Sequence, residues 1–291
     1  MSPSELIDCG KGVMSVAATC RLLDVPRSSY YEQRARGPSQ RKLQDAALAV
    51  HVRDVHERSK KRYGSPRIHK ALRARGVHVG RKRVARLMCE HRLVARPKRR
   101  FRVTTNSEHS FPIAPNLLQR NFTAESPDKV WIGDITYVWT REGWMYLAVL
   151  IDVYSRRVVG WAMRPYLSRE LALETLRRAL ELRRPAPGLI HHTDRGCQYA
   201  SHDYQALLRE HGLRPSMSRR GNCLDNAMAE SFFSTLEHEL LRDFVFDTRT
   251  QATSEVAEYI ENFYNRERMH SALDYISPME YELRDVMQMA A

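Results

Sequence analysis

Several features are scarce in this sequence, and each absence narrows what the protein can be. No apolar run approaches the roughly 18 consecutive residues of a membrane span, and the opening residues MSPSELIDCGKGVMS lack the apolar core of a signal peptide. The five cysteines form no CxxC pair and are odd in number, so neither a zinc site nor a disulfide framework is expected. We therefore expect a cytoplasmic protein with reduced thiols and no membrane partner.

Acidic residues are scarce in the first part of the chain. Residues 1–120 contain 27 Lys and Arg against 9 Asp and Glu, whereas residues 121–291 contain 20 against 25. Within 51–100 the count is 18 against 3. A solvated helical face explains so large an excess less well than a nucleic-acid-binding segment. The distribution indicates such a segment joined to a part with another function.

Short helical patterns fill the basic part. Two segments, 15–34 and 66–92, each predict a pair of short helices around a turn, which is the pattern of a helix-turn-helix. We therefore predict a basic, small all-α helix-turn-helix region that binds DNA over 1–100. Residues 101–124 contain prolines and no hydrophobic period, which is typical of a linker.

Basic side chains in and after the second helix pair are the candidate DNA contacts. Arg81, Lys82, Arg83 and Arg86 are expected on the outward side of the second helix, where they would reach phosphates or base edges. The full set of expected DNA-binding residues is Arg67, Lys70, Arg81, Lys82, Arg83, Arg86, Lys98, Arg99 and Arg100.

From residue 127 the pattern changes to β-rich runs and longer helices. Three β-rich runs, KVWIGDITYVWT, GWMYLAVLIDV and RRVVGWAMRPY, are separated by short turns and predict antiparallel strands. An amphipathic helix, a strand, a helix, a short strand and a helix follow. The order β-β-β-α-β-α-β-α is that of the α/β ribonuclease-H-like (integrase) fold with a mixed five-stranded sheet. We predict this catalytic domain, with a C-terminal helix, over 125–285.

Three carboxylates are expected to converge in this fold. Asp134 interrupts an apolar strand, where a charge is costly without a partner or a metal. Asp194 ends the fourth strand, which lies parallel and adjacent to the first, and Glu230 lies one turn into the last core helix. Converging carboxylates repel one another unless cations neutralise them, and hard oxygen ligands favour Mg²⁺ or Mn²⁺. Two such ions would suit in-line phosphoryl transfer.

Other polar residues near these acids compete for the same roles. Asp152 at a strand end is expected to be structural, and Asp225 is expected to cap the following helix. Glu237 lies two turns beyond Glu230 and is the rival third acid. His191 and His192 are expected to be structural, because hard cations prefer oxygen.

Two assignments stay open at this level. Asn226 either lines the site, touches DNA or caps the helix. In the C-terminal segment, Arg266, Arg268 and His270 either contact DNA phosphates or pack against the core.

The motifs together resemble one family. They are YGSPRIHKALRARGVHVGRKRVARLM, WIGDITYV, LIDVYSRRVVGWAM, HHTDRGCQYAS, GNCLDNAMAESFFSTLEHEL and YNRERMHSALDYISPMEY. They are similar to DDE transposases of the retroviral-integrase superfamily, and more closely to the OrfB-type product of a bacterial insertion sequence, over about residues 15 to 283. The family's three catalytic acids fall on Asp134, Asp194 and Glu230, which implies metal-dependent DNA cleavage and strand transfer.

The resemblance also implies partners. The family's active protein is usually a fusion with a short upstream-frame (OrfA-type) product, which supplies end recognition and a coiled coil. This chain has no sustained heptad pattern, so we expect it to be the catalytic portion of a larger transposase. We expect it to multimerise on DNA, at the nucleoid of a bacterial cell. The alternative functions are a catalytically idle repressor of its own element, or a nuclease of the same fold without strand transfer.

Overall fold

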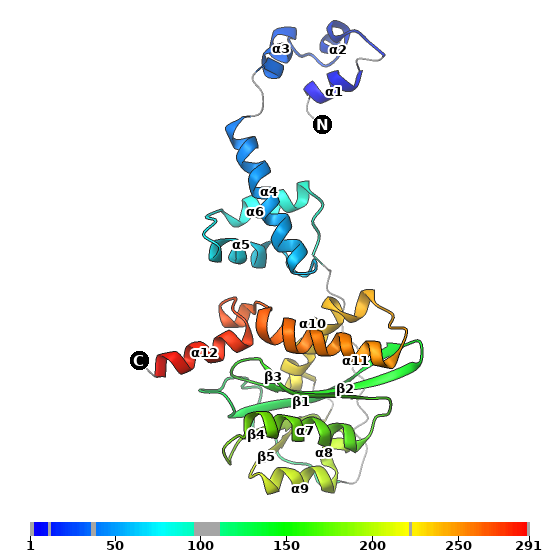
Figure 1. Cartoon of the computed structure of the whole chain (residues 1–291), viewed down its shortest axis with the longest axis vertical. Helices are drawn as coiled ribbons and strands as arrows, with labels where there is room; N and C mark the ends of the chain where they lie inside the picture. Colours follow the sequence, from blue (N-terminus) through cyan, green and yellow to red (C-terminus); the bar gives the residue numbers. More distant parts are fainter. Residues whose placement is uncertain (1–2, 11–12, 36–38, 96–110, 221–222, 290–291) are drawn as a thin grey trace. The chain divides into compact units, whose positions relative to one another are not determined.

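The computed structural model describes residues 3–10, 13–35, 39–95, 111–220 and 223–289. The chain forms two compact units, Met1–Ala95 and Arg96–Ala291. Within the described residues, no helix combines the length and the apolarity that a membrane crossing requires. The first unit is helical and the second is built on a sheet (Figure 1).

The described part of the first unit contains only helices. They are α1 (Pro3–Gly10), α2 (Val16–Leu22), α3 (Arg27–Ala35), α4 (Gln40–Arg58), α5 (Ser65–Ala74) and α6 (Arg81–Glu90). Helices α1 to α3 share a small core of Ile7, Cys20 and Tyr30, all at most 1% exposed. The sequence predicts α2 and α3 but not α1, which is short and contributes Ile7 to this core.

Helices α5 and α6 form the predicted second helix-turn-helix. Their apolar residues recur at helical spacing, so Ile68 and Leu72 on α5 and Val84 and Leu87 on α6 are buried together. Gly76 has a φ of +77°, a left-handed conformation that favours glycine and ends α5. Helix α4 packs against both of them.

The second unit is organised by a mixed five-stranded sheet. Its strands are β1 (Val130–Thr140), β2 (Gly143–Asp152), β3 (Val158–Arg164), β4 (Ile190–Thr193) and β5 (Arg214–Met217), in the order β3-β2-β1-β4-β5. The first three strands pair antiparallel, and β4 lies parallel to both β1 and β5. This topology confirms the predicted ribonuclease-H-like fold and places β1 beside β4.

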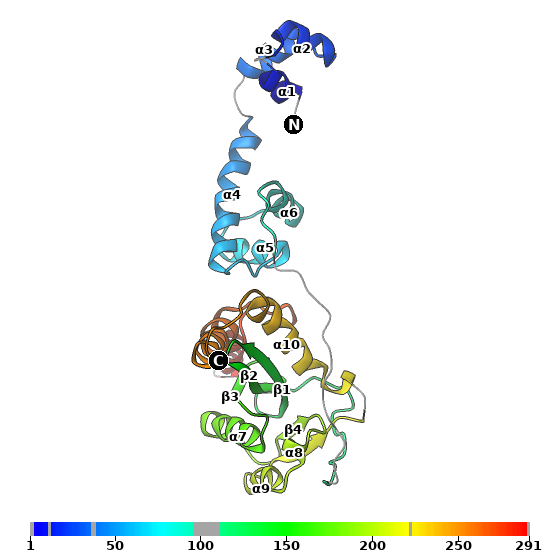
Figure 2. The same ribbon diagram turned by 90° about the vertical axis from the view of Figure 1, so that its right-hand side faces the viewer.

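Helices cover both faces of the sheet. They are α7 (Arg169–Arg183), α8 (Cys197–Ala200), α9 (His202–Glu210), α10 (Ala227–Glu239), α11 (Arg249–Ala257) and α12 (Pro278–Met289). Figures 1 and 2 show α7 to α9 on one face and α10 and α11 on the other. An apolar core lies under α7 and α9, where Trp131 and Leu176 are fully buried. Helix α11 continues as a π-helix, Glu258–Glu267.

The described end of the predicted linker, 111–124, packs onto this unit. Leu118 is 6% exposed. The Leu117 backbone N–H donates to Ser216 Oγ at 2.9 Å, and Asn116 Nδ2 donates to Asp225 Oδ2 at 2.9 Å. These contacts fix residues of 111–124 to the core; the boundaries at 100 and 124 stay predictions.

Candidate active site

Two of the three predicted acids lie on neighbouring strands. The parallel register pairs Gly133 of β1 with Thr193 of β4, so the next residues, Asp134 and Asp194, lie side by side. Neighbouring strands are about 4.8 Å apart. A Cβ at Gly133 would lie 2.8 Å from Leu150 Cδ2 and 3.2 Å from Thr193 Cγ2, so the strand beside Asp134 has no room for a side chain.

Backbone donors hold both carboxylates. Asp194 Oδ1 accepts from the Gly196 N–H at 2.9 Å, which forms a tight turn directly after β4. Asp134 Oδ1 accepts from the Ile135 N–H at 2.8 Å. These bonds fix the orientation of each carboxylate.

The third acid, Glu230, enters from α10. It lies in the first turn of that helix, and α10 contacts β1. Figure 2 shows α10 crossing the face of the sheet. Glu230 is half-buried, as are Asp134 and Asp194.

The electrostatics of the site show that these acids influence one another. The pKa of Asp134 is raised well above its usual value, first by burial, then by the negative charge of Asp194 and, to a smaller degree, by that of Glu230. Burial also raises the pKa of Glu230. A cation placed among the three would favour their charged forms, so this arrangement suits a cation.

The donor set fits a hard divalent cation. All candidate ligand atoms are carboxylate oxygens, the ligands that Mg²⁺ and Mn²⁺ prefer. Within the described ranges, however, no three His, Cys, Asp or Glu side chains are yet close enough together to hold an ion. Asp134 and Asp194 are adjacent. The charge of Glu230 raises the pKa of Asp134 less than the charge of Asp194 does.

The two histidines before Asp194 make hydrogen bonds in the core, although His191 Nδ1 has no partner among the described residues. His191 Nε2 lies 2.7 Å from Tyr204 Oη, and His192 contacts Ser216 Oγ at 2.8 Å and the Asp225 carbonyl oxygen at 3.0 Å. Burial lowers the pKa of His191 to about 3 and that of His192 to about 4. Both rings are neutral and structural, as predicted.

Asp225 has a different role from the predicted cap. The residue at the N-cap of α10 is Asn226, and it makes no side-chain capping bond. The Asp225 carboxylate, which is fully buried, instead accepts from Arg219 at 2.8 Å and from Arg120 at 3.1 Å. Asn226 is 5% exposed, and its Oδ1 has no hydrogen-bond partner within the described part of the chain. The missing capping bond excludes a capping role, and its other roles stay predictions.

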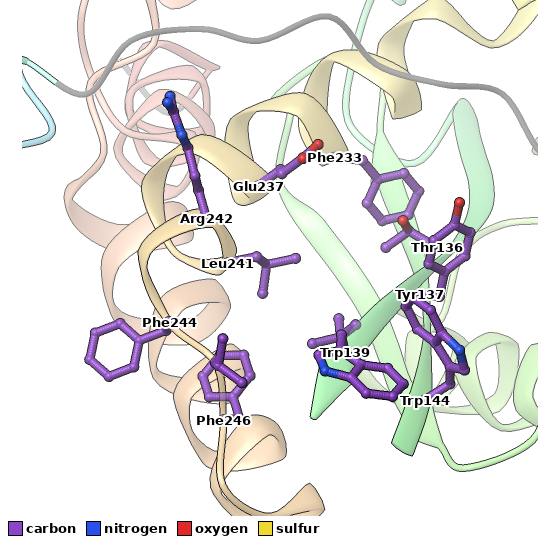
Figure 3. A pocket seen from close by; sticks show the side chains of 12 residues that line it. Thr136, Tyr137, Trp139, Trp144, Phe233, Glu237, Leu241, Arg242, Phe244 and Phe246 are labelled. Atoms are coloured by element: carbon purple, nitrogen blue, oxygen red, sulfur yellow. The ribbon is translucent and has the colours of Figure 1, made fainter. Parts of the chain in front are cut away.

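Glu237, the rival third acid, lies elsewhere. It is exposed on α10 and lines an aromatic pocket of about 370 Å³ between that helix and the β1–β2 hairpin. Figure 3 shows Thr136, Tyr137 and Trp144 on one side of this pocket and Leu241 and Arg242 on the other. Glu237 therefore lies among aromatic rings, whereas Glu230 is the helix residue whose charge acts on Asp134.

Two further acidic or basic candidates have structural roles. Asp152 is fully buried and accepts from the Asp128 and Ser155 N–H groups at 2.7 and 2.9 Å, so it fixes the end of β2 as predicted. Arg268 is 4% exposed and pairs with buried Glu239 at 2.9 Å. Of the two predicted roles, this residue therefore packs against the core and does not contact DNA.

The predicted DNA-binding residues fall into three groups. Arg83 and Arg86 are half-buried and pair with Asp45 of α4 at 2.7 and 2.6 Å, so they help to hold α4 against α6. Arg81 and Lys82 are exposed on the first turn of α6. The remaining members are Arg67, which lies over the Tyr63 ring, exposed Lys70, and Lys98, Arg99 and Arg100, which lie outside the described residues.

Comparison with known proteins places the chain in a family. Residues 124–223 and 230–285 match two integrase core domain families, and residues 42–101 match an HTH-like domain family. The insertion element IS600 uncharacterized 31 kDa protein of Shigella sonnei is 46% identical over 272 residues, which cover 94% of this chain and 100% of that protein. The transposase InsF for insertion sequence IS3A of Escherichia coli is 42% identical over 94% of this chain and 95% of its own length.

This chain belongs to the insertion-sequence transposases. The transposase for insertion sequence element IS904 of Lactococcus lactis is a further relative, 44% identical over 85% of this chain and 98% of that protein. The integrase core and these relatives assign DNA transposition and integration to the family, and with it the activity of a polynucleotidyl transferase.

Solved structures give more distant likenesses. A simian T-cell lymphotropic virus intasome matches 79% of this transposase and 73% of its own chain, with 17% identity and a TM-score of 0.46. An HTLV-2 integrase catalytic core in complex with magnesium matches 54% and 98%, with 16% identity and a TM-score of 0.43. These likenesses are too distant to bear on single residues.

Proposed function

We propose that this transposase cuts insertion-sequence ends and joins them to DNA at Asp134, Asp194 and Glu230. The observation that carries the proposal is the pairing of Asp134 with Asp194 across adjacent parallel strands, where burial and mutual repulsion raise the pKa of Asp134. Two half-buried carboxylates that repel each other cost folding free energy. A cation that binds between the two carboxylates during the reaction would offset this cost.

The group that fits this site is a pair of Mg²⁺ or Mn²⁺ ions held by the three acids. When bound, two such ions stabilise the attacking and leaving oxygens of an in-line phosphoryl transfer. Asp134 and Asp194 would hold them from the sheet, and Glu230 from α10. No protein nucleophile is required, because positioning and charge supply the catalysis.

The reaction consists of two phosphoryl transfers, and each forms one P–O bond and breaks another. In the first, water attacks the phosphodiester at the element end, the P–O3′ bond breaks, and the 3′-oxygen leaves with a proton as a hydroxyl. In the second, that hydroxyl attacks another phosphodiester, forms a new P–O3′ bond and releases the former 3′-oxygen. The acids stay unmodified throughout.

The DNA partners are the element ends and a target duplex. The first unit would hold DNA through phosphate contacts, with Arg81 and Lys82 as the strongest candidates because they are exposed. An upstream-frame (OrfA-type) product would add end recognition, and several copies would assemble on the DNA.

A nicking-and-joining assay tests the proposal. Labelled element ends are incubated with Mn²⁺ and either the wild-type chain or Asp134→Asn, Asp194→Asn or Glu230→Gln, with the upstream-frame product supplied. Each substitution should abolish both nicked and joined products while DNA binding persists. The matched control is Glu237→Gln on the same helix, which should keep most activity. If the wild-type chain gives nicked but no joined products, it is a nuclease. If it binds DNA and gives neither product, it is a repressor.

A further inference from the structure

A buried tyrosine shortly after β4 has a hydroxyl with no hydrogen-bond partner among the residues that the structure describes. Tyr199 of α8 is 2% exposed, and its Oη makes no hydrogen bond within the described residues. Buried hydroxyls are almost always paired, because an unpaired one loses the hydrogen bonds that water gave it. Such an exception needs a physical explanation.

The turn after β4 brings this tyrosine to Asp194. The turn is closed by the Gly196 N–H bond to Asp194 Oδ1, and the Tyr199 N–H donates to the Gly196 carbonyl at 3.0 Å. A Cβ at Gly196 would lie 3.0 Å from Asp194 Oδ1 and 3.7 Å from Tyr199 Cδ2. The carboxylate and the ring therefore flank the same glycine, which has no side chain to separate them.

The neighbouring buried tyrosine has an ordinary structural role. Tyr204 is 1% exposed, and its ring lies edge-to-face with Tyr199 at 5.4 Å. Its Oη is paired with His191 Nε2 at 2.7 Å. Among the described residues, one tyrosine hydroxyl of this layer is therefore paired, and the other, on the ring that flanks Gly196 together with Asp194, is not.

We propose that Tyr199 is a positioning residue, whose hydroxyl donates a hydrogen bond to the Asp134–Asp194 carboxylate pair when a divalent cation is held there. The inference rests on the proposed metal-holding role of those acids. Carboxylates that hold a metal are usually oriented by hydrogen bonds from such outer partners.

The chemistry of the hydroxyl supports this role. Burial, followed by the nearby Tyr204, Asp134 and Asp194, raises the pKa of Tyr199 well above its usual value. The group therefore stays protonated and acts as a donor at all physiological pH values. A phenol donor and a carboxylate acceptor make a charge-assisted bond, which is stronger than a neutral one.

A matched pair of substitutions tests the proposal. Tyr199→Phe and Tyr204→Phe each remove one buried hydroxyl, from adjacent rings in the same layer. Mn²⁺ binding to the full-length chain is followed by electron paramagnetic resonance of the free ion, and Tm is measured in EDTA. Tyr199→Phe should weaken Mn²⁺ binding about 10-fold and leave Tm unchanged or raised, because the removed group had no partner. Tyr204→Phe should lower Tm and leave Mn²⁺ binding unchanged.

The opposite results are equally clear. Mn²⁺ binding by Tyr199→Phe at wild-type strength, or a fall in its Tm like that of Tyr204→Phe, would overturn the positioning role. Asp134→Asn serves as the reference and should lose Mn²⁺ binding. If Asp134→Asn binds as wild type does, or wild type binds no Mn²⁺ at millimolar concentrations, the proposed metal site itself is wrong. If only the proposed role of Tyr199 is wrong, Asp134→Asn still loses Mn²⁺ binding while Tyr199→Phe keeps it.

Discussion

Asp134 is held where its own charge is unfavourable, so it should cost stability in the metal-free protein. Its pKa is raised in the folded state by burial and by Asp194. The stabilisation from its protonated form is complete below the unfolded pKa of about 3.9, and it is lost as pH rises through the raised folded pKa. The penalty therefore grows with pH above the unfolded pKa, and the folded protein bears it at neutral pH.

The substitution Asp134→Asn should remove that penalty. We expect it to stabilise the protein in EDTA at pH 7 by about 1 kcal/mol or more, and to abolish any rise of Tm on adding Mg²⁺. Differential scanning calorimetry with and without Mg²⁺ measures both effects. Asp203→Asn is the control, because Asp203 is exposed and pairs only at the surface with Arg169. A less stable Asp134→Asn protein would show that the carboxylate is a structural group.

At the scale of residues, the sequence reveals a charged side chain in an apolar segment. It does not reveal which distant residues pair with one another. Asp134 is visible as a carboxylate inside an apolar strand. The pairing of Arg83 and Arg86 with Asp45 joins residues 38 and 41 positions apart, and no local pattern encodes it. The unpaired Tyr199 hydroxyl is equally invisible, because only the folded layer shows which of two neighbouring tyrosines has a partner.

At the scale of elements, the loop before α10 is held by one carboxylate. Asp225 accepts from Arg219 of that loop, and also from Asn116 and Arg120 of the segment before β1. Hydrogen bonding by Arg219, more than any other cause, lowers the pKa of Asp225 far below its usual value. Its stabilisation is therefore present above about pH 4 and lost as pH falls below the unfolded pKa.

We expect Asp225→Ala to destabilise the protein by about 2 kcal/mol at pH 7, because it removes the buried acceptor that Asn116, Arg120 and Arg219 share. Cleavage should fall as well, since the start of α10 carries Glu230. Urea unfolding and the nicking assay measure the two effects. Asp247→Ala is the control: its partner Arg141 and Asp247 itself are 72% and 70% exposed, so it should change neither. Equal stability of Asp225→Ala and wild type would contradict the anchoring role.

The order of elements is the part of the fold that sequence patterns predict best. All five strands and the amphipathic helices α7, α9 and α10 follow from periodicity. The π-helix Glu258–Glu267 does not, because its hydrophobic spacing predicts an ordinary helix. The one-turn helix α8 is too short to give a period, although it carries Tyr199.

At the scale of the whole molecule, charge separates the two functions. The basic first part should contribute DNA affinity through released counterions. Replacing Arg81 and Lys82 with alanine should flatten the slope of log affinity against log salt by about 0.9 for each lost contact. Fluorescence anisotropy across a salt series measures it. Arg209→Ala with Arg214→Ala, two exposed cations of the second unit, is the control and should leave the slope unchanged. An unaltered slope in the α6 double mutant would exclude phosphate contacts there.

Specific recognition of the element ends should need the upstream-frame product. This chain alone should bind element-end and scrambled duplexes with similar affinity at physiological salt, because phosphate contacts do not read sequence. Competition binding with both duplexes measures the ratio. Discrimination of about 10³-fold or more, as specific binders show, would mean that the helix-turn-helix pairs at 15–34 and 66–92 suffice.

The central claim is that Asp134, Asp194 and Glu230 hold the catalytic ions together. The most direct test is the anomalous diffraction of Mn²⁺ in crystals of the full-length chain bound to element-end DNA. The account predicts anomalous density between the Asp134 and Asp194 carboxylates, with Glu230 drawn in as a ligand. Anomalous density at Glu237 in the aromatic pocket would contradict it. So would the absence of density at the acid pair, provided that the same crystals nick DNA when they are dissolved.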